Sequence, residues 1–196
     1  MNLNQYGWEN AASIMPGEAI MLPAGGYICE IKNAFFVKSK KGSPMINLCL
    51  DVTEGDFAGY FTKSTKRAKT YNPGKPWDNS GIYRQNICNN DGKISPYFKG
   101  LINALIADNA AVKNDFTPAN FQPEQLFGAR LGFVFGEEEY DFNGYSGVKC
   151  VPKFPKSIAD INSGNFKIPD RKTLPADNVP KNTLEGTPIS DEDTPF

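Results

Sequence analysis

Two neighbouring segments with alternating apolar side chains constrain the fold of this chain more than any other feature. In the segment 27–37, one face is expected to carry Tyr27, Cys29, Ile31, Phe35 and Val37, and the other Ile28, Glu30, Lys32 and Phe36. In the segment 45–53, the expected core face carries Ile46, Leu48, Leu50 and Val52. The residues between them, 38–44, are rich in Lys and contain Gly and Pro. The pattern therefore predicts a long antiparallel hairpin with a basic tip.

One helix has a clear signature. Its apolar stripe consists of Phe98, Leu101, Ile102, Leu105 and Ile106. Ser95 is expected to be the N-cap, and Pro96 the first helical residue. A shorter helical turn is expected around 123–127, ended by Gly128.

The remaining segments give the order of the fold. Strand character is found at 60–66, 130–135 and 145–154, and more weakly at 82–88. The last two strands are expected to be joined by an acidic loop containing Glu137, Glu138 and Glu139. The chain is therefore expected to be mainly β, with three strands, a helix and two strands. A five-stranded barrel with one helix between strands 3 and 4 is the OB-fold, although a plain α+β sheet fits the same order.

The last part of the chain has a different composition. From Pro169 onward it contains five prolines and no aromatic residue before Phe196. Such a segment buries too little apolar surface to offset the entropy of ordering it. We therefore expect a folded domain over residues 1–165 and a disordered acidic interaction tail over residues 166–196.

Absent residue types exclude several kinds of site. The chain has no His, which rules out a Ser-His-Asp triad, a Cys-His dyad and a Cys₂His₂ zinc site. Its four cysteines, Cys29, Cys49, Cys88 and Cys150, form no C-x-x-C pair, and no convincing pair of catalytic carboxylates is found. A non-enzyme without metal or cofactor is expected. The N-terminus does not resemble a signal peptide and no apolar run is long enough to span a membrane, so a cytoplasmic location without membrane contact is expected.

Charge is distributed unevenly along the chain. Residues 32–75 contain nine basic and three acidic residues, whereas residues 185–196 contain four acidic residues and no basic one. This asymmetry indicates an anionic ligand for the body and a separate role for the tail. A well-solvated surface with clustered signs is the alternative.

The segment 60–84 interleaves cations with aromatic residues, including Tyr60 and Phe61. Proteins that bind single-stranded nucleic acid need a positive groove for phosphates and aromatic faces for bases. The candidate binding residues in this segment are Lys63, Lys66, Arg67, Lys69, Tyr71, Lys75, Trp77, Tyr83 and Arg84. The alternative is that the aromatic side chains pack into the core.

The first hairpin provides a second candidate patch. If Phe35 faces the core, Phe36 faces outward beside lysines, and the hairpin tip adds more. The candidate residues are Lys32, Phe36, Lys38, Lys40 and Lys41, with Lys149 and Lys153 of the last strand as weaker additions. A lysine-protected edge strand is the alternative.

The last six residues form a compact recognition signal. Phe196 can fill an apolar pocket, its terminal carboxylate can meet a basic residue, and the preceding acids can contact a basic rim. The candidate partner-binding residues are Asp191, Glu192, Asp193, Thr194, Pro195 and Phe196.

The ending DEDTPF resembles the acidic tip of bacterial single-stranded DNA-binding proteins, with Thr194 where that family usually has a hydrophobic residue. The body is similar to phage-encoded single-stranded DNA-binding proteins, in residues 22–27, in residues 41–48, and around Glu139, Tyr140 and Gly144. The resemblance implies an OB-fold that coats single-stranded DNA during phage replication or recombination, in the host cytoplasm. It also implies that the tip recruits replication or recombination proteins.

Two other functions fit the sequence. One is an adaptor that engages host replication machinery through its tail and binds no DNA. The other, less well supported, is a small enzyme of nucleic-acid metabolism that uses carboxylates and a metal. The sequence leaves open whether copies assemble into a homo-oligomer.

Overall fold

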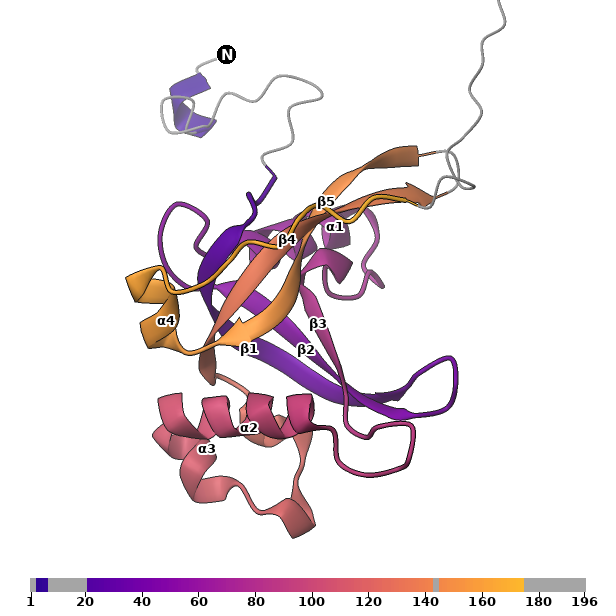
Figure 1. The fold of residues 1–196 in the computed structure, drawn as a ribbon. Coiled ribbons are helices and arrows are strands. Elements are labelled where there is room, and N and C mark those ends of the chain that lie inside the picture. Colours follow the sequence, from indigo (N-terminus) through magenta and orange to yellow (C-terminus); the bar gives the residue numbers. More distant parts are fainter. Residues whose placement is uncertain (1–2, 7–20, 143–144, 175–196) are drawn as a thin grey trace, which may run out of the picture.

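The computed structural model describes residues 3–6, 21–142 and 145–174 (Figure 1). Its centre is a five-stranded antiparallel sheet in the order β3-β2-β1-β4-β5. The strands are β1 (Gly25–Lys38), β2 (Pro44–Val52), β3 (Ile82–Asn86), β4 (Arg130–Phe142) and β5 (Tyr145–Lys156). The fold is thus mainly β, as predicted, and β1 lies in the middle of the sheet.

The sheet is open between its two edge strands. In the described ranges, no hydrogen-bonded ladder joins β3 to β5, so the closed barrel predicted from the sequence is not formed. Pro152 and Pro155 lie in β5, and a proline has no N–H to donate to a neighbouring strand. These prolines limit pairing along the outer edge of β5.

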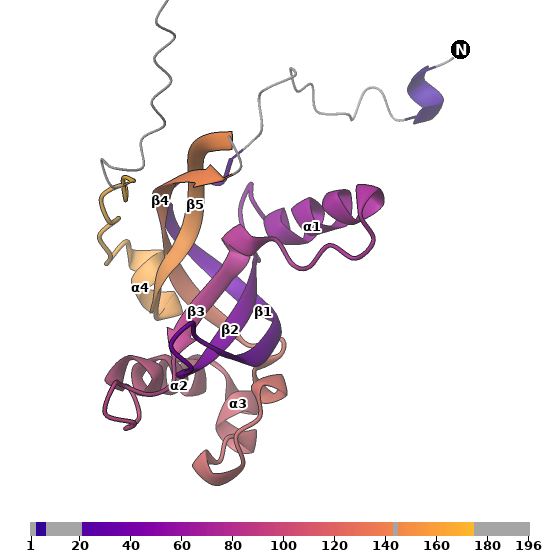
Figure 2. The same ribbon diagram turned by 90° about the vertical axis from the view of Figure 1, so that its right-hand side faces the viewer.

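The helices are α1 (Tyr60–Tyr71), α2 (Pro96–Asp108), α3 (Ala110–Asp115) and α4 (Ile158–Ser163), with 3₁₀ turns η1 (Leu3–Tyr6), η3 (Asn79–Gly81), η4 (Pro118–Asn120) and η5 (Pro123–Leu126). Helix α1 lies at one end of the sheet, α2 and α3 lie at the other, and α4 lies beside β4 and β1 (Figure 2). The prediction for α2 is confirmed, because Ser95 is its N-cap residue and its apolar stripe is largely buried. It lies between β3 and β4, as expected. The turn η5 is also confirmed, and Gly128 follows it with φ 78°.

The segment 60–66 is helical, so the prediction of a strand there is wrong. The side chain of Asp51, buried on β2, accepts a hydrogen bond from the backbone N–H of Phe61 at 3.0 Å. Its second oxygen accepts one from the hydroxyl of Thr62. A carboxylate in this position accepts hydrogen bonds from free donors of the first helical turn. Its negative charge also interacts favourably with the positive end of the helix dipole. The third strand of the sheet is β3 instead.

A bulge in β1 reverses the expected faces of Phe35 and Phe36. The pairing of β1 with β2 shifts between Ile31 and Asn33, and such an irregularity changes which residues face the core. Phe36 pairs with Ile46, whose side chain lies in the core, and packs against Phe121. Phe35 lies on the opposite, outer face and is partly exposed. The prediction that Phe35 faces the core is therefore wrong. Phe36 lies on the core side of the sheet but is 48% exposed, so its ring is accessible, as predicted.

Residues 166–174, which the sequence analysis assigns to the tail, lie along β4; we call this segment the strap. Glu137, Glu138 and Glu139 are part of β4 and do not form the expected loop. The backbone N–H of Lys172 donates to the carbonyl of Glu137 at 3.0 Å, and that of Glu139 donates to the carbonyl of Lys172 at 2.9 Å. Arg171 pairs with Glu137 at 2.5 Å. The strap therefore covers the edge of β4 beyond its last pair with β1.

A chain ending at residue 165 is expected to hold the outer part of the β4–β5 hairpin less firmly than a chain ending at residue 174. Two lost backbone hydrogen bonds correspond to about 2 kcal/mol, or about 30-fold faster local opening. The rate of trypsin cleavage at Lys149 measures this opening. Equal rates in the two chains would contradict the assigned role of the strap.

The four cysteines are free thiols, and Cys29, Cys49 and Cys150 are buried. Burial raises the pKa of Cys49 to about 11 and that of Cys150 to about 12. Both are protonated at neutral pH, so they contribute as apolar side chains. In the part of the chain described, no helix combines the length and apolar character needed to cross a bilayer.

Candidate nucleic-acid interface

The outer face of β1, β2 and β3 carries a row of three side chains suited to a nucleotide. Phe35 pairs with Asn47 on β2, and Asn47 pairs with Arg84 on β3. Paired residues project from the same face of a sheet. Phe35 is 37% exposed and Arg84 is exposed, while Asn47 between them is buried. An aromatic ring on β1 and a guanidinium on β3 thus flank Asn47 on the same face, where a base can stack and a phosphate can be bound.

Helix α1 adds a cluster of cations at one end of this face (Figure 2). Its exposed cations are Lys63, Lys66, Arg67 and Lys69. Lys63, Lys66 and Arg67 share one side of the helix because they are three and four residues apart. Among the described residues, no carboxylate lies within ion-pair distance of any of the four. Their charge is therefore available to an anionic ligand.

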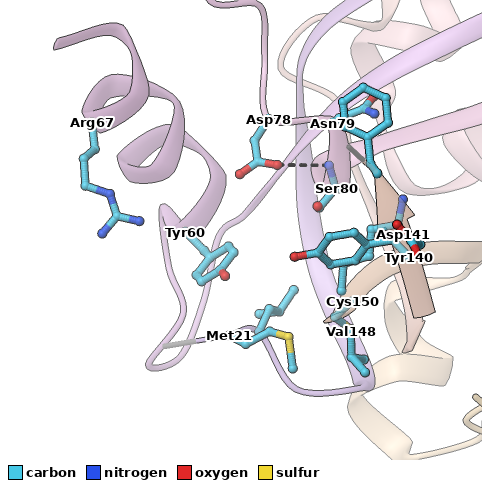
Figure 3. A pocket seen from close by; sticks show the side chains of 13 residues that line it. Met21, Tyr60, Arg67, Asp78, Asn79, Ser80, Tyr140, Asp141, Val148 and Cys150 are labelled. Carbon is cyan, nitrogen blue, oxygen red and sulfur yellow. Dashed lines mark hydrogen bonds between the residues drawn. The ribbon is translucent and has the colours of Figure 1, made fainter. Parts of the chain in front are cut away.

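A cleft of about 750 Å³ separates α1 from the β4–β5 hairpin (Figure 3). We call the outer part of this hairpin, residues 136–142 and 145–150, the arm. Helix α1 contributes Tyr60 and Arg67, and the arm contributes Tyr140, Phe142 and Lys149 among others. In Figure 3 the rings of Tyr60 and Tyr140 point toward one another across the cleft. The cleft thus combines aromatic walls with one cation on each side.

Two acids also line the cleft. Asp78 accepts hydrogen bonds from the Ser64 hydroxyl at 2.5 Å and from the Ser80 N–H at 3.0 Å, so its oxygens are already engaged. Asp141 lies on the arm and is exposed. Burial raises the pKa of Tyr60, so its phenol is neutral at physiological pH. The ring of Tyr60 thus offers a surface for stacking, and Asp78 and Asp141 offer hydrogen-bond acceptors. Neither Tyr60 nor Cys150, whose pKa values burial raises, is ionised in the cleft at neutral pH.

Arg84 connects the cleft to the outer face of the sheet. Its guanidinium donates to the side-chain oxygen of Asn79, which lines the cleft, and to the carbonyl of Ile82 at 3.3 Å. Both partners are neutral, so the positive charge is retained. We call α1, the cleft and the row from Arg84 to Phe35 the binding surface. Lys38, Lys40 and Lys41 at the hairpin tip are exposed beyond it.

Several predicted residues fall outside the binding surface. Tyr83 is only 7% exposed and packs against Phe133, with ring centroids 5.2 Å apart. Trp77 is half-buried against the core, in a pocket beside α1 that Lys75 also lines. The exposed aromatic residue of the predicted segment is Tyr71, which ends α1 and is 86% exposed.

Three predicted lysines are engaged in ion pairs. Lys32 pairs with Glu30 at 2.8 Å, and Lys153 pairs with Glu138 at 2.7 Å. Lys149 lies 3.9 Å from Glu138, a looser pair, and also lines the cleft. Burial disfavours ionisation of Glu138, but its hydrogen bond with Lys153 and the charge of that lysine lower its pKa. The predicted tip, residues 191–196, lies outside the described residues and stays a prediction.

Sequence reasoning missed Phe35, Asn47, Tyr140 and Phe142. Asn47 carried a signal, because it is a polar residue inside an apolar strand. Tyr140 and Phe142 alternate with Asp141 beyond the acidic run, which is typical of a strand with one aromatic face. No family model matches this chain, and no characterised protein is similar enough in sequence to count as a relative.

Proposed function

We propose that this protein binds and protects single-stranded DNA without catalysis and largely without regard to sequence. The observation that carries the proposal is the binding surface. Four cations on α1, none of them paired with an acid in the part of the chain that the structure describes, stand next to a cleft with facing tyrosines. The cations would hold phosphates, and the rings would stack on bases. Every base has a flat face, so stacking tolerates any sequence.

The fold is proposed to be a partly open OB-fold. Two features support this assignment: the strand order β3-β2-β1-β4-β5 and the place of α2 between β3 and β4. OB-folds are partly open Greek-key barrels that bind oligonucleotides on the face of their second and third strands. In this chain, that face carries Asn47 and Arg84.

The biological setting is part of the same proposal. We place the protein in the host cytoplasm during phage DNA replication or recombination, with residues 191–196 recruiting replication or recombination proteins. The resemblance of the DEDTPF ending to single-stranded DNA-binding proteins supports this part. Removing residues 190–196 should abolish partner capture and leave DNA affinity unchanged or higher.

The direct test is a titration of the purified protein with labelled oligo-dT and with a matched duplex, over a series of salt concentrations. Preferential binding to the single strand is expected, with log K falling by about 0.7 per phosphate contact for each tenfold rise in salt. No binding to either form at low salt would contradict the proposal and favour the adaptor function.

Phe35 and Phe36 provide a matched pair, since they are neighbours on opposite faces of β1. Phe35→Ala is expected to weaken binding to oligo-dT by about 5- to 150-fold, the equivalent of one stacked base, with little change in stability. Phe36→Ala is expected to leave the affinity unchanged and to lower stability through its contact with Phe121. The reverse pattern, measured by fluorescence anisotropy and urea unfolding, would exclude the outer face as the binding surface.

A further inference from the structure

A second groove, of about 640 Å³, follows the opening between β3 and β5. We call it the seam groove. Its walls include Arg84 from β3, Tyr97 from the first turn of α2, and Phe154 and Lys156 from β5. The groove exists because the two edge strands do not pair, and it is separate from the cleft between α1 and the arm.

The charged side chains that line the seam groove are basic, and the nearby Asp160 interacts electrostatically with Lys156 from outside the lining. Its lining residues include Arg84, Lys153 and Lys156 and no carboxylate. Lys153 is neutralised by Glu138 at 2.7 Å. Among the described residues, neither Arg84 nor Lys156 is within ion-pair distance of an acid. The positive end of the α2 dipole lies at the same place, because Pro96 and Tyr97 begin that helix and line the groove.

The seam groove also offers aromatic surface. Tyr97 is 79% exposed, so its ring is accessible to a ligand at the rim of the groove. Phe154 is half-buried in the opposite wall. A cationic groove with an exposed ring at its rim has the same chemistry as the binding surface, although it lies on a different side of β3.

The edges of the groove are poorly suited to an added peptide strand. Pro152 and Pro155 give β5 no backbone donor at two positions. On β3, the carbonyls of Ile82 and Asn86 already accept hydrogen bonds from the side chains of Arg84 and Gln85. Strand addition depends on free backbone groups at the edge, so the groove favours a ligand recognised by charge and stacking.

We propose that the seam groove is a second subsite for the same nucleic-acid strand, in which Arg84 and Lys156 bind phosphates and Tyr97 stacks on a base. Arg84 borders both the groove and the binding surface, so one strand can pass from one to the other. This inference rests on the proposed function and extends it: longer single strands occupy both subsites, and short ones occupy the binding surface alone.

The test uses the double variant Tyr97→Ala/Lys156→Glu of the full chain and oligo-dT of about 4 to about 20 nucleotides, a range that spans known OB-fold site sizes. The variant is expected to bind the shortest oligonucleotides like the wild type and the longest at least about 5- to 150-fold more weakly, the loss of one stacked base. The lost phosphate contact of Lys156 adds about eightfold at about 50 mM salt. As the oligonucleotide is lengthened, the affinity of the double variant should reach its plateau at a shorter oligonucleotide than the affinity of the wild type. Tyr97→Phe, which keeps the ring, should retain the wild-type affinity.

Lys113→Glu, an exposed charge reversal on α3, is the matched control and is expected to change nothing at any length. Equal affinities of the double variant and the wild type on long oligonucleotides would overturn the inference. So would an equal loss at every length, because the groove would then belong to a single site. Binding of a poly-Glu peptide that the double variant abolishes, with DNA binding unchanged, would identify a protein-docking groove instead. If the wild type binds no oligonucleotide of any length, the proposed function itself fails.

Discussion

Replacing Lys66 and Arg67 by Glu is expected to weaken binding to single-stranded DNA by about 60-fold at about 50 mM salt. Each phosphate contact releases counterions worth about eightfold in affinity at that salt concentration, and two contacts are lost. The side chains lie on the exposed side of α1, and within residues 3–6, 21–142 and 145–174 neither has an acidic partner at ion-pair distance. Repulsion by the new carboxylates adds to the loss.

The salt dependence separates this effect from damage to the fold. In a plot of log K against log salt concentration, the slope should become shallower by about 1.4 units, about 0.7 for each lost contact. The matched control is Lys99→Glu/Lys113→Glu, which reverses two exposed charges on α2 and α3. That variant has the same net charge and should keep the wild-type slope. An unchanged slope in the α1 variant, or an equal change in the control, would remove α1 from the interface.

Asp51→Ala is expected to lower the free energy of unfolding by about 3 kcal/mol, because a buried donor loses its acceptor and two charge-assisted hydrogen bonds disappear. The carboxylate is 3% exposed and joins β2 to the first turn of α1 through Phe61 and Thr62. Urea unfolding measures the change. DNA affinity should fall as well, because α1 would no longer be held in place beside the cleft.

Two milder substitutions test this explanation of Asp51. Asp51→Asn keeps one oxygen that can accept from the Phe61 N–H, and Thr62→Val removes only the hydroxyl bond. Each is expected to cost about 1 to 1.5 kcal/mol, the value of a single hydrogen bond. If Asp51→Ala is no worse than Thr62→Val, the carboxylate does not hold the N-terminus of α1.

Local sequence patterns predict the helices and strands whose formation depends on residues close together in the sequence. The β1–β2 hairpin follows from alternation and a turn rich in Lys and Gly, and α2 follows from its apolar stripe and Pro96. The sequence patterns do not predict helix α1, because the group that accepts the hydrogen bonds of its first turn is the side chain of Asp51. That residue lies on strand β2, ten residues before Phe61. No local periodicity contains that information.

The residues of the proposed binding surface follow from the sequence only in part, for a similar reason. The α1 cations and Arg84 were identified from composition, which does not depend on the exact backbone. Which of the two neighbouring rings lies on the outer face depends on register. The bulge near Lys32 places Phe35 on that face and leaves Phe36, which is still 48% exposed, on the core side. The contribution of Tyr140 depends on α1 and the arm facing one another, which only the tertiary arrangement provides.

The central position of β1 has a consequence for synthesis. Its partner β2 follows after a short turn, but its other partner, β4, pairs Phe135 with Gly25, more than a hundred residues apart. A growing chain can therefore complete β1, β2 and β3 while one edge of β1 has no neighbour. Contacts that span so much of the chain slow folding, and open edges invite pairing between chains. Fragments that stop before β4 should accumulate as aggregates, since the strand that closes the edge of β1 arrives late in translation.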